Sequence, residues 1–190
     1  ILNISSPPAS GVETIQITPT NAYAICNSLG NRLSVAECTI NLTLIDRLEP
    51  TINDIDIIAD SIVTITSSED MYNNVGASGA ISTNHFQATV YQNNGNASEA
   101  TIVNITNDNQ GPLVGGEKIV RIGFVTDLLP SGVEEMTISP AGPANPIYDP
   151  ENNQMPQNTI SARVFLPDRL PPKIISETAL IAIDNSYVEF

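Results

Sequence analysis

Residues 38–46 read CTINLTLID, and this stretch decides between a helical and a β-strand chain. Taken with its flanks, as SVAECTINLTLIDRL, the run is long enough to form a helix. Its apolar side chains, however, fall at every second position, at Ile40, Leu42 and Leu44. Successive side chains of a strand point to opposite faces, so this spacing predicts a strand with one apolar face.

The same alternation of apolar and polar residues recurs along the chain. Further candidate strands are ETIQIT (13–18), IVTIT (62–66), FQATVYQ (86–92), ATIVNIT (100–106), EKIVRIGFV (117–125), EEMTIS (134–139), TISARVF (159–165) and TALIAID (178–184). Ile, Val and Thr favour strands, and fourteen scattered prolines would interrupt long helices. We therefore predict an all-β fold, a β-sandwich or jelly-roll of Ig-like or pilin-like kind. The sandwich domain is expected to span 19–190, after an extended N-terminal strand within 1–18.

Three connecting segments have distinct compositions. QNNGN (92–96) predicts a β-hairpin, because Asn94-Gly95 tolerates the positive φ of a type I′ turn. SPAGPANPIYDPENNQMPQN (139–158) carries five prolines and predicts a long surface excursion. SSPPASG (5–11) predicts a semi-rigid linker in the N-terminal extension.

The charge balance excludes several classes of partner. Seven Lys and Arg oppose 21 Asp and Glu, for a net charge of −14, so we expect no binding to nucleic acid or to an anionic membrane surface. No run of 18 apolar residues exists, so no membrane span is expected. Lysine occurs only at Lys118 and Lys173, and the remaining polar surface is rich in Asn, Thr and Ser. This composition is typical of extracellular proteins.

The chain starts at Ile1 rather than at Met, which predicts a processed N-terminus whose signal peptide has been removed. The alternative is that the numbering simply starts at the first residue given. The processed N-terminus and the surface composition together predict an extracellular or cell-surface location.

Two cysteines, Cys26 and Cys38, lie on either side of a Gly30-Asn31 turn. An oxidising compartment would let them form a disulfide, and closing a loop of this size stabilises a chain by about 3 kcal/mol in the chain-entropy model. Two buried free thiols are the alternative. A zinc site is not expected, because His85 is the only histidine.

Asn-x-Ser/Thr triplets, the acceptors of N-glycosylation, occur at Asn3, Asn41, Asn96 and Asn104. Four triplets are close to the number that this composition gives by chance, so their placement carries the argument. The Asn41 side chain should point to the strand face opposite its apolar neighbours, and the Asn104 side chain should likewise point away from that of Ile105. Asn96 follows a turn. We expect all of them to be exposed and at least two of them to be glycosylated, with unmodified exposed asparagine as the alternative.

Acidic clusters raise the hypothesis of a calcium site. The candidates are Asp54 and Asp56 in NDIDIIAD, Asp108 in TNDNQG and Asp149 in DPENN. Ca²⁺ takes six to eight oxygen ligands, which such loops supply, but none of the three has EF-hand spacing. We therefore favour solvated loop carboxylates, keep a calcium site as the alternative, and expect no cofactor.

The sequence predicts no enzyme. It contains no Gly-x-Ser-x-Gly and no P-loop, and a Ser–His or Cys–His arrangement would have to use His85. The chain also has no Trp, whereas glycosidases and carbohydrate-binding modules usually present aromatic platforms to sugars.

The N-terminal stretch ILNISSPPASGVETIQIT, followed by AYAIC…EC and the array of strands, resembles the thread and pilus subunits of archaea. Chaperone–usher pilins of bacteria are less similar, because their cysteine pair is spaced more widely. Members of such families polymerise by donor-strand complementation, in which a terminal strand of one subunit completes the sheet of the next. The resemblance implies an extracellular filament of identical subunits that acts in adhesion or biofilm formation. It also implies that the inserted residues are Ile1, Leu2 and Ile4, or Val12, Ile15 and Ile17.

Two alternatives stay open, a monomeric cell-surface adhesin or surface-layer domain and, third, a viral jelly-roll coat protein. The source also stays open. High Asn and Gln with little Lys run against the usual trend of hyperthermophiles, so a mesophilic bacterial surface protein fits as well.

Overall fold

The computed structural model describes residues 7–21, 25–32, 40–173, 180–181 and 188–189. Within them the regular structure is almost all β, with one 3₁₀ turn, η1 (Thr83–His85), so the predicted all-β fold is confirmed. None of these residues belongs to a helix long and apolar enough to cross a bilayer.

The strands, in chain order, are β1 (Thr14–Ile17), β2 (Ile40–Thr43), β3 (Ile52–Ala59), β4 (Ile62–Met71), β5 (Phe86–Tyr91), β6 (Ala100–Asn107), β7 (Glu117–Thr126), β8 (Glu135–Pro140), β9 (Val164–Phe165), β10 (Leu180–Ile181) and β11 (Val188–Glu189). Two antiparallel sheets form the sandwich, one in the order β3-β4-β7-β6 and the other in the order β5-β8-β9. Within the described residues, β1 pairs only with β2, and β10 only with β11.

The core lies between the two sheets and follows from the two-residue period of their strands. On β4, Val63 and Ile65 are fully buried while Thr64 and Thr66 between them are half-buried. The four-stranded sheet contributes Ile55, Val63, Ile65, Val120, Ile122 and Phe124, and the three-stranded sheet contributes Phe86, Met136 and Ile138. Each fully buried aliphatic or aromatic side chain of this kind contributes about 1.5–3 kcal/mol.

The predicted long loop after β8 is present and closes one end of the sandwich. Between Pro140 and β9 the chain forms no strand, although Ile147 and Met155 from this segment are buried in the core. Tyr148 and Tyr72 exchange two backbone hydrogen bonds of 2.8 Å, which fasten the loop to the end of β4. The excursion is therefore packed onto the sandwich.

The predicted β5–β6 hairpin is wrong, and the positive-φ turn lies one residue earlier than predicted, at Asn93-Asn94 rather than Asn94-Gly95. The Gly95 N–H donates to the Gln92 carbonyl at 2.7 Å, and Asn93 and Asn94 between them have φ of 49° and 66°. Positive φ at both central residues is the mark of a type I′ turn. The flanking strands nevertheless pair elsewhere, β5 with β8 and β6 with β7.

Glu134, the residue before β8, explains why the chain crosses from one sheet to the other at this turn. Its carboxylate accepts the backbone N–H groups of Asn96 at 2.6 Å and of Ala97 at 3.0 Å. These N–H groups follow the turn directly and are thereby held on the carboxylate rather than on β5. A side chain at Gly95 would overlap the same carboxylate, so only glycine fits at this position.

β3 is an edge strand of the four-stranded sheet, and two of its features discourage pairing with a further strand. Asp54 and Asp56 are exposed on it, and its register with β4 shifts twice, between Ile52 and Asp54 and between Ile57 and Ala59. Charged side chains and bulges on an edge strand both discourage the addition of another strand. These aspartates, two of the calcium candidates, lie along a strand rather than in a loop.

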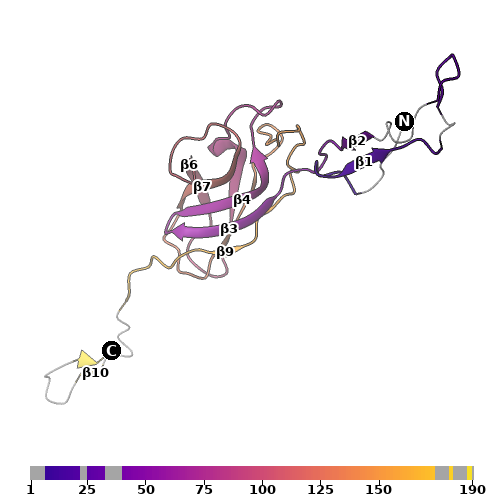
Figure 1. Ribbon diagram of the computed structural model, residues 1–190. Helices are drawn as coiled ribbons and strands as arrows, with labels where there is room; N and C mark the ends of the chain where they lie inside the picture. Colours follow the sequence, from indigo (N-terminus) through magenta and orange to yellow (C-terminus); the bar gives the residue numbers. More distant parts are fainter. Residues whose placement is uncertain (1–6, 22–24, 33–39, 174–179, 182–187, 190) are drawn as a thin grey trace.

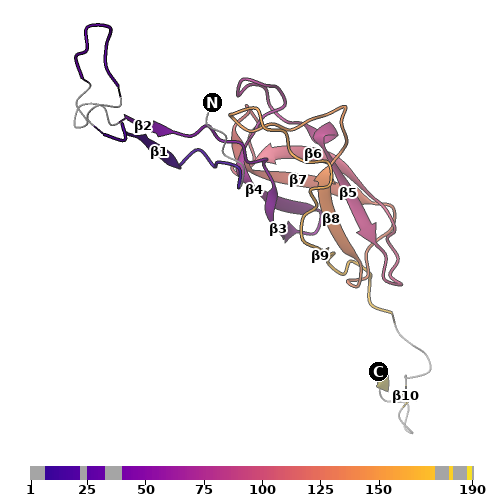
Figure 2. The ribbon, with the colours of Figure 1, turned by 90° about the vertical axis from the view of Figure 1, so that its right-hand side faces the viewer.

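β1 and β2 form a two-stranded ribbon that lies outside the sandwich. Both views show the ribbon leaving one end of the sandwich and the segment after β9 leaving the opposite end (Figures 1 and 2). The expected boundary between extension and domain, at residues 18 and 19, lies within the chain between the two strands of the ribbon, because the partner of β1 is β2.

Candidate functional site

The ribbon has one apolar face and one polar face. Ile15 pairs with Leu42, and Ile17 pairs with Ile40, so all four aliphatic side chains project from the same side. Ile17 is 51% exposed, Ile40 56% and Leu42 49%, and Ile15 is half-buried. The predicted donor residues Ile15 and Ile17 therefore share an exposed apolar face with two residues of β2.

The opposite face carries Thr14, Gln16, Asn41 and Thr43. Asn41 is an exposed sequon asparagine, so a glycan attached there would leave the apolar face uncovered. Val12, another predicted donor residue, is 81% exposed just before β1. The remaining donor candidates, Ile1, Leu2 and Ile4, lie outside the described residues.

Asp46 lies where the ribbon meets the sandwich. Its carbonyl accepts a hydrogen bond of 3.3 Å from the Asn153 side chain of the long loop. The Arg47 N–H donates to the Ala9 carbonyl at 2.8 Å, which keeps the N-terminal segment alongside. Gly11, with φ of 77°, passes so close that an added Cβ would lie 3.3 Å from the Asp46 Cβ. The ribbon base, the N-terminal segment and the long loop thus contact one another at this junction.

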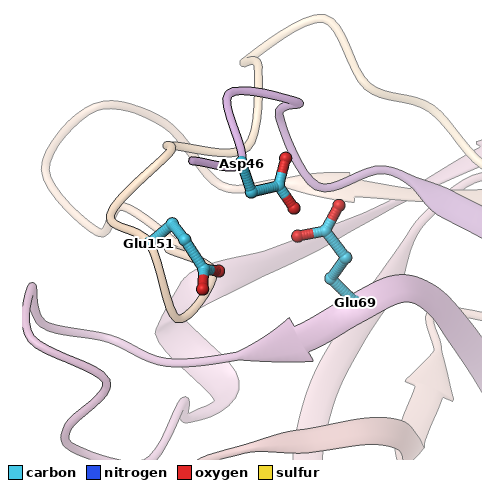
Figure 3. Close-up of side chains that lie close together, drawn as sticks. All are labelled: Asp46, Glu69 and Glu151. Carbon is cyan, nitrogen blue, oxygen red and sulfur yellow. The ribbon is translucent and has the colours of Figure 1, made fainter. Parts of the chain in front are cut away.

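Three carboxylates converge at this junction, as Figure 3 shows. Asp46 comes from the ribbon base, Glu69 from β4 and Glu151 from the long loop, and one oxygen of each lies within 4.8 Å of the others. Burial and then the charges of Asp46, Asp149 and Glu151 raise the pKa of Glu69 to about 7. Near neutral pH this carboxyl group is therefore only partly ionised.

Asp149, a calcium candidate, is fully buried behind the cluster. Its two carboxylate oxygens accept hydrogen bonds of 2.8 Å from the backbone and side chain of Asn153. It also lies close enough to Glu69 for a hydrogen bond between the two carboxyl groups to raise the pKa of Glu69. The structure thus places one of the four predicted calcium candidates beside the cluster.

The other candidates lie elsewhere, Asp54 and Asp56 on β3 and Asp108 after β6. Oxygen ligands suit hard cations, and the three clustered carboxylates could hold one, but Ca²⁺ takes six to eight ligands. Asp46 and Glu69 were missed from the sequence because 22 positions separate them, and only the fold brings them together.

Three of the four sequon asparagines, Asn41, Asn96 and Asn104, are described and exposed, as their placement predicted. Glycosylation itself stays a prediction, and Asn3 lies outside the described residues. Cys26 is exposed and takes part in an isolated β-bridge with Arg32. Cys38 lies outside the described residues, so the Cys26–Cys38 disulfide also stays a prediction.

His85, the only histidine, forms a local contact at η1. Its Nδ1 lies 3.0 Å from both the backbone nitrogen and the hydroxyl oxygen of Ser82. This is a Ser–His contact within a single turn, and His85 also lines a cavity of about 330 Å³ beside the long loop.

These features define the class as an all-β sandwich protein that extends an amphipathic two-stranded ribbon from one end. Neither a family model, nor a curated protein, nor a solved structure matches this chain.

Proposed function

We propose that this chain is a structural subunit of an extracellular filament, polymerised by strand exchange between identical copies. The observation that carries the proposal is the apolar face of the ribbon, formed by Ile15, Ile17, Ile40 and Leu42. A two-stranded ribbon is marginally stable in water by itself, and an exposed apolar strand surface is a template for another chain. A strand from a neighbouring copy would cover this face.

The energetic gain from covering this face is substantial. Full burial of an exposed aliphatic side chain contributes about 1.5–3 kcal/mol, and these four are already about half buried, so covering the rest contributes on the order of 3–6 kcal/mol. The cost of ordering and associating the chains reduces this gross value. Backbone hydrogen bonds along a free edge of β1 or β2 would add to it, as in other cases of β-strand addition.

The placement of the ribbon favours growth in one direction. The ribbon leaves one end of the sandwich, and the segment after β9 leaves the other (Figures 1 and 2). A contact between unlike ends of identical subunits repeats from copy to copy, and it generates a filament when the rotation between copies does not close into a ring. An extracellular location, the Cys26–Cys38 disulfide and glycans on the sequon asparagines complete the proposal, with adhesion or biofilm formation as its role.

The test compares Ile40→Asp with Val125→Asp by electron microscopy of the assembled protein. Ile40 lies on the apolar face of the ribbon. Val125 is 52% exposed on β7, an inner strand of the four-stranded sheet. We expect filaments from the unmodified chain and from Val125→Asp, and none from Ile40→Asp. A stable monomer at high concentration would favour the monomeric adhesin instead and reject the filament.

A further inference from the structure

A cavity of about 330 Å³ opens between the loop after β4 and the long loop after β8. Its walls are Asn73, Asn74 and Val75 from the first loop and residues 144–146 and Tyr148 from the second, with His85 between them. The Asn73 N–H donates to the Gly79 carbonyl at 3.2 Å, and Tyr148 is fastened to Tyr72. Both walls are thus held by backbone hydrogen bonds, as expected of a preformed site.

His85 presents one ring nitrogen that has no partner in the described part of the chain. The Ser82 backbone N–H donates to Nδ1 at 3.0 Å, so Nδ1 uses its lone pair as an acceptor. The neutral ring then carries its proton on Nε2. His85 is only 8% exposed, and burial lowers its pKa. It therefore offers a single N–H donor at the cavity and does not suit a metal ion, which needs the lone pair of Nε2.

Three asparagines add uncharged amide groups to the cavity lining. Asn74 Nδ2 donates to Asn73 Oδ1 at 2.6 Å, which leaves Asn73 Nδ2 as a donor and Asn74 Oδ1 as an acceptor. The Asn145 side chain makes no hydrogen bond with the described residues, so it offers both groups. No lining residue is charged. A ligand must supply several donors and acceptors at close spacing and no net charge.

We propose that this cavity binds a neutral sugar through its hydroxyl groups. Each hydroxyl both donates and accepts, so a pair of neighbouring hydroxyls matches an asparagine amide. An anionic sugar is disfavoured by a chain of net charge −14. A peptide is less suited, because peptide binding relies mainly on an open strand edge or an apolar groove. The chain lacks Trp, so hydrogen bonds and the Tyr148 ring must replace an aromatic platform.

Saturation-transfer-difference NMR tests the proposal on the whole chain, and it works whether the protein is a monomer or a filament. The probes are methyl α-mannopyranoside, methyl β-galactopyranoside and N-acetylglucosamine, with glucuronate as an anionic sugar and N-acetylglycinamide as a peptide-like amide. We expect saturable binding of at least one neutral sugar and weaker binding of the other two probes. No saturable sugar binding, or equal binding of glucuronate or the amide, would overturn the proposal.

Asn145→Ala locates the site, with the exposed Asn109→Ala as its control. Loss of one hydrogen bond of about 1 kcal/mol weakens binding about fivefold. A second pair uses two glycines of nearly equal φ, 77° at Gly79 and 76° at Gly76. Alanine at Gly79 would displace the Asn73 and Asn74 amides, whereas Gly76 has open space around it. Equal affinity in all four variants would place any sugar elsewhere and reject this cavity. None of these results depends on filament formation.

Discussion

Glu134 has no exposed surface and still carries a negative charge at neutral pH. Burial opposes ionisation, but hydrogen bonds from the backbones of Ala97, Ser131 and Asn96 outweigh it and lower the pKa to about 2. One carboxylate oxygen holds the turn after β5, and the other accepts the backbone N–H and hydroxyl of Ser131. A single side chain thereby fixes two loops at the same end of the sandwich.

Replacing Glu134 by Gln should destabilise the fold strongly. The amide nitrogen of Gln cannot accept a hydrogen bond, so donors on one side of the carboxylate position lose their acceptor. Each unsatisfied buried donor costs about 1–3 kcal/mol. We expect the urea midpoint to fall by an amount equivalent to roughly 2 kcal/mol or more.

Glu135→Gln is the matched control for this measurement. Glu135 forms an ion pair with Arg163 at 3.1 Å, and the Arg163 side chain is 50% exposed. Exposed ion pairs contribute about 0–1 kcal/mol, so this neighbour should lose little. Equal losses in the two variants would contradict the role assigned to Glu134.

The elements differ in how well the sequence predicted them. β1, β2 and β4 to β8 all fall on stretches whose alternation predicted strands, because one face of each is apolar. β3 was not predicted as a strand, because Asp54 and Asp56 were interpreted as candidate calcium ligands in a loop. On this edge strand the aspartates occupy the outer face, while Ile55 between them is buried.

Partners of strands were harder to predict than strands themselves. A positive-φ turn was predicted at Asn94-Gly95 and forms one residue earlier, at Asn93-Asn94. The hairpin fails because Glu134, about 40 residues away, accepts hydrogen bonds from the N–H groups that follow the turn. Likewise, the carboxylates of Asp46, Glu69 and Glu151 meet only after three separate segments fold together. Local patterns carry no information about such distant contacts.

The loop before β7 depends on a close approach of two backbones. Gly115 has φ of 97°, and an added Cβ would lie 2.7 Å from the Gly79 carbonyl oxygen. We expect Gly115→Ala to destabilise the protein by about 2–3 kcal/mol, from positive-φ strain and this clash together.

Gly76→Ala separates the two causes in a thermal or denaturant unfolding series. Gly76 also has positive φ but has nothing within 4 Å of an added Cβ, so only the strain of about 1 kcal/mol applies. If Gly115→Ala lowered the free energy of unfolding no more than Gly76→Ala, the backbone contact would contribute nothing to stability.

For the whole molecule, Glu134 and Glu69 give opposite dependences of stability on pH. Both carboxyls ordinarily titrate near 4.5. The lowered pKa of Glu134 stabilises the fold above 4.5, and this contribution is lost as pH falls toward about 2. The raised pKa of Glu69 stabilises the fold below 4.5, and this contribution is lost as pH rises to about 7.

The two effects predict a maximum of stability on the acidic side of neutrality. Self-repulsion within a chain of net charge −14 acts in the same direction above that maximum. The melting temperature should fall between pH 5 and 7.5 in the unmodified protein and fall less in Glu69→Gln. The exposed Glu99→Gln, which lies far from the cluster in sequence on the approach to β6, should retain the original slope. A flat profile in the unmodified protein would contradict the raised pKa of Glu69.

The charged outer edge of β3 has a consequence for how filaments of this chain would pack side by side. In the proposed filament, the exposed Asp54 and Asp56 carboxylates of β3 would repeat once per subunit and would repel the same edge of a neighbouring filament. Such exposed charges act over a Debye length of about 8 Å at physiological ionic strength and about 3 Å at 1 M. In the proposed filament, dilute salt would therefore keep neighbouring filaments apart, whereas brine would screen these charges and permit lateral bundling.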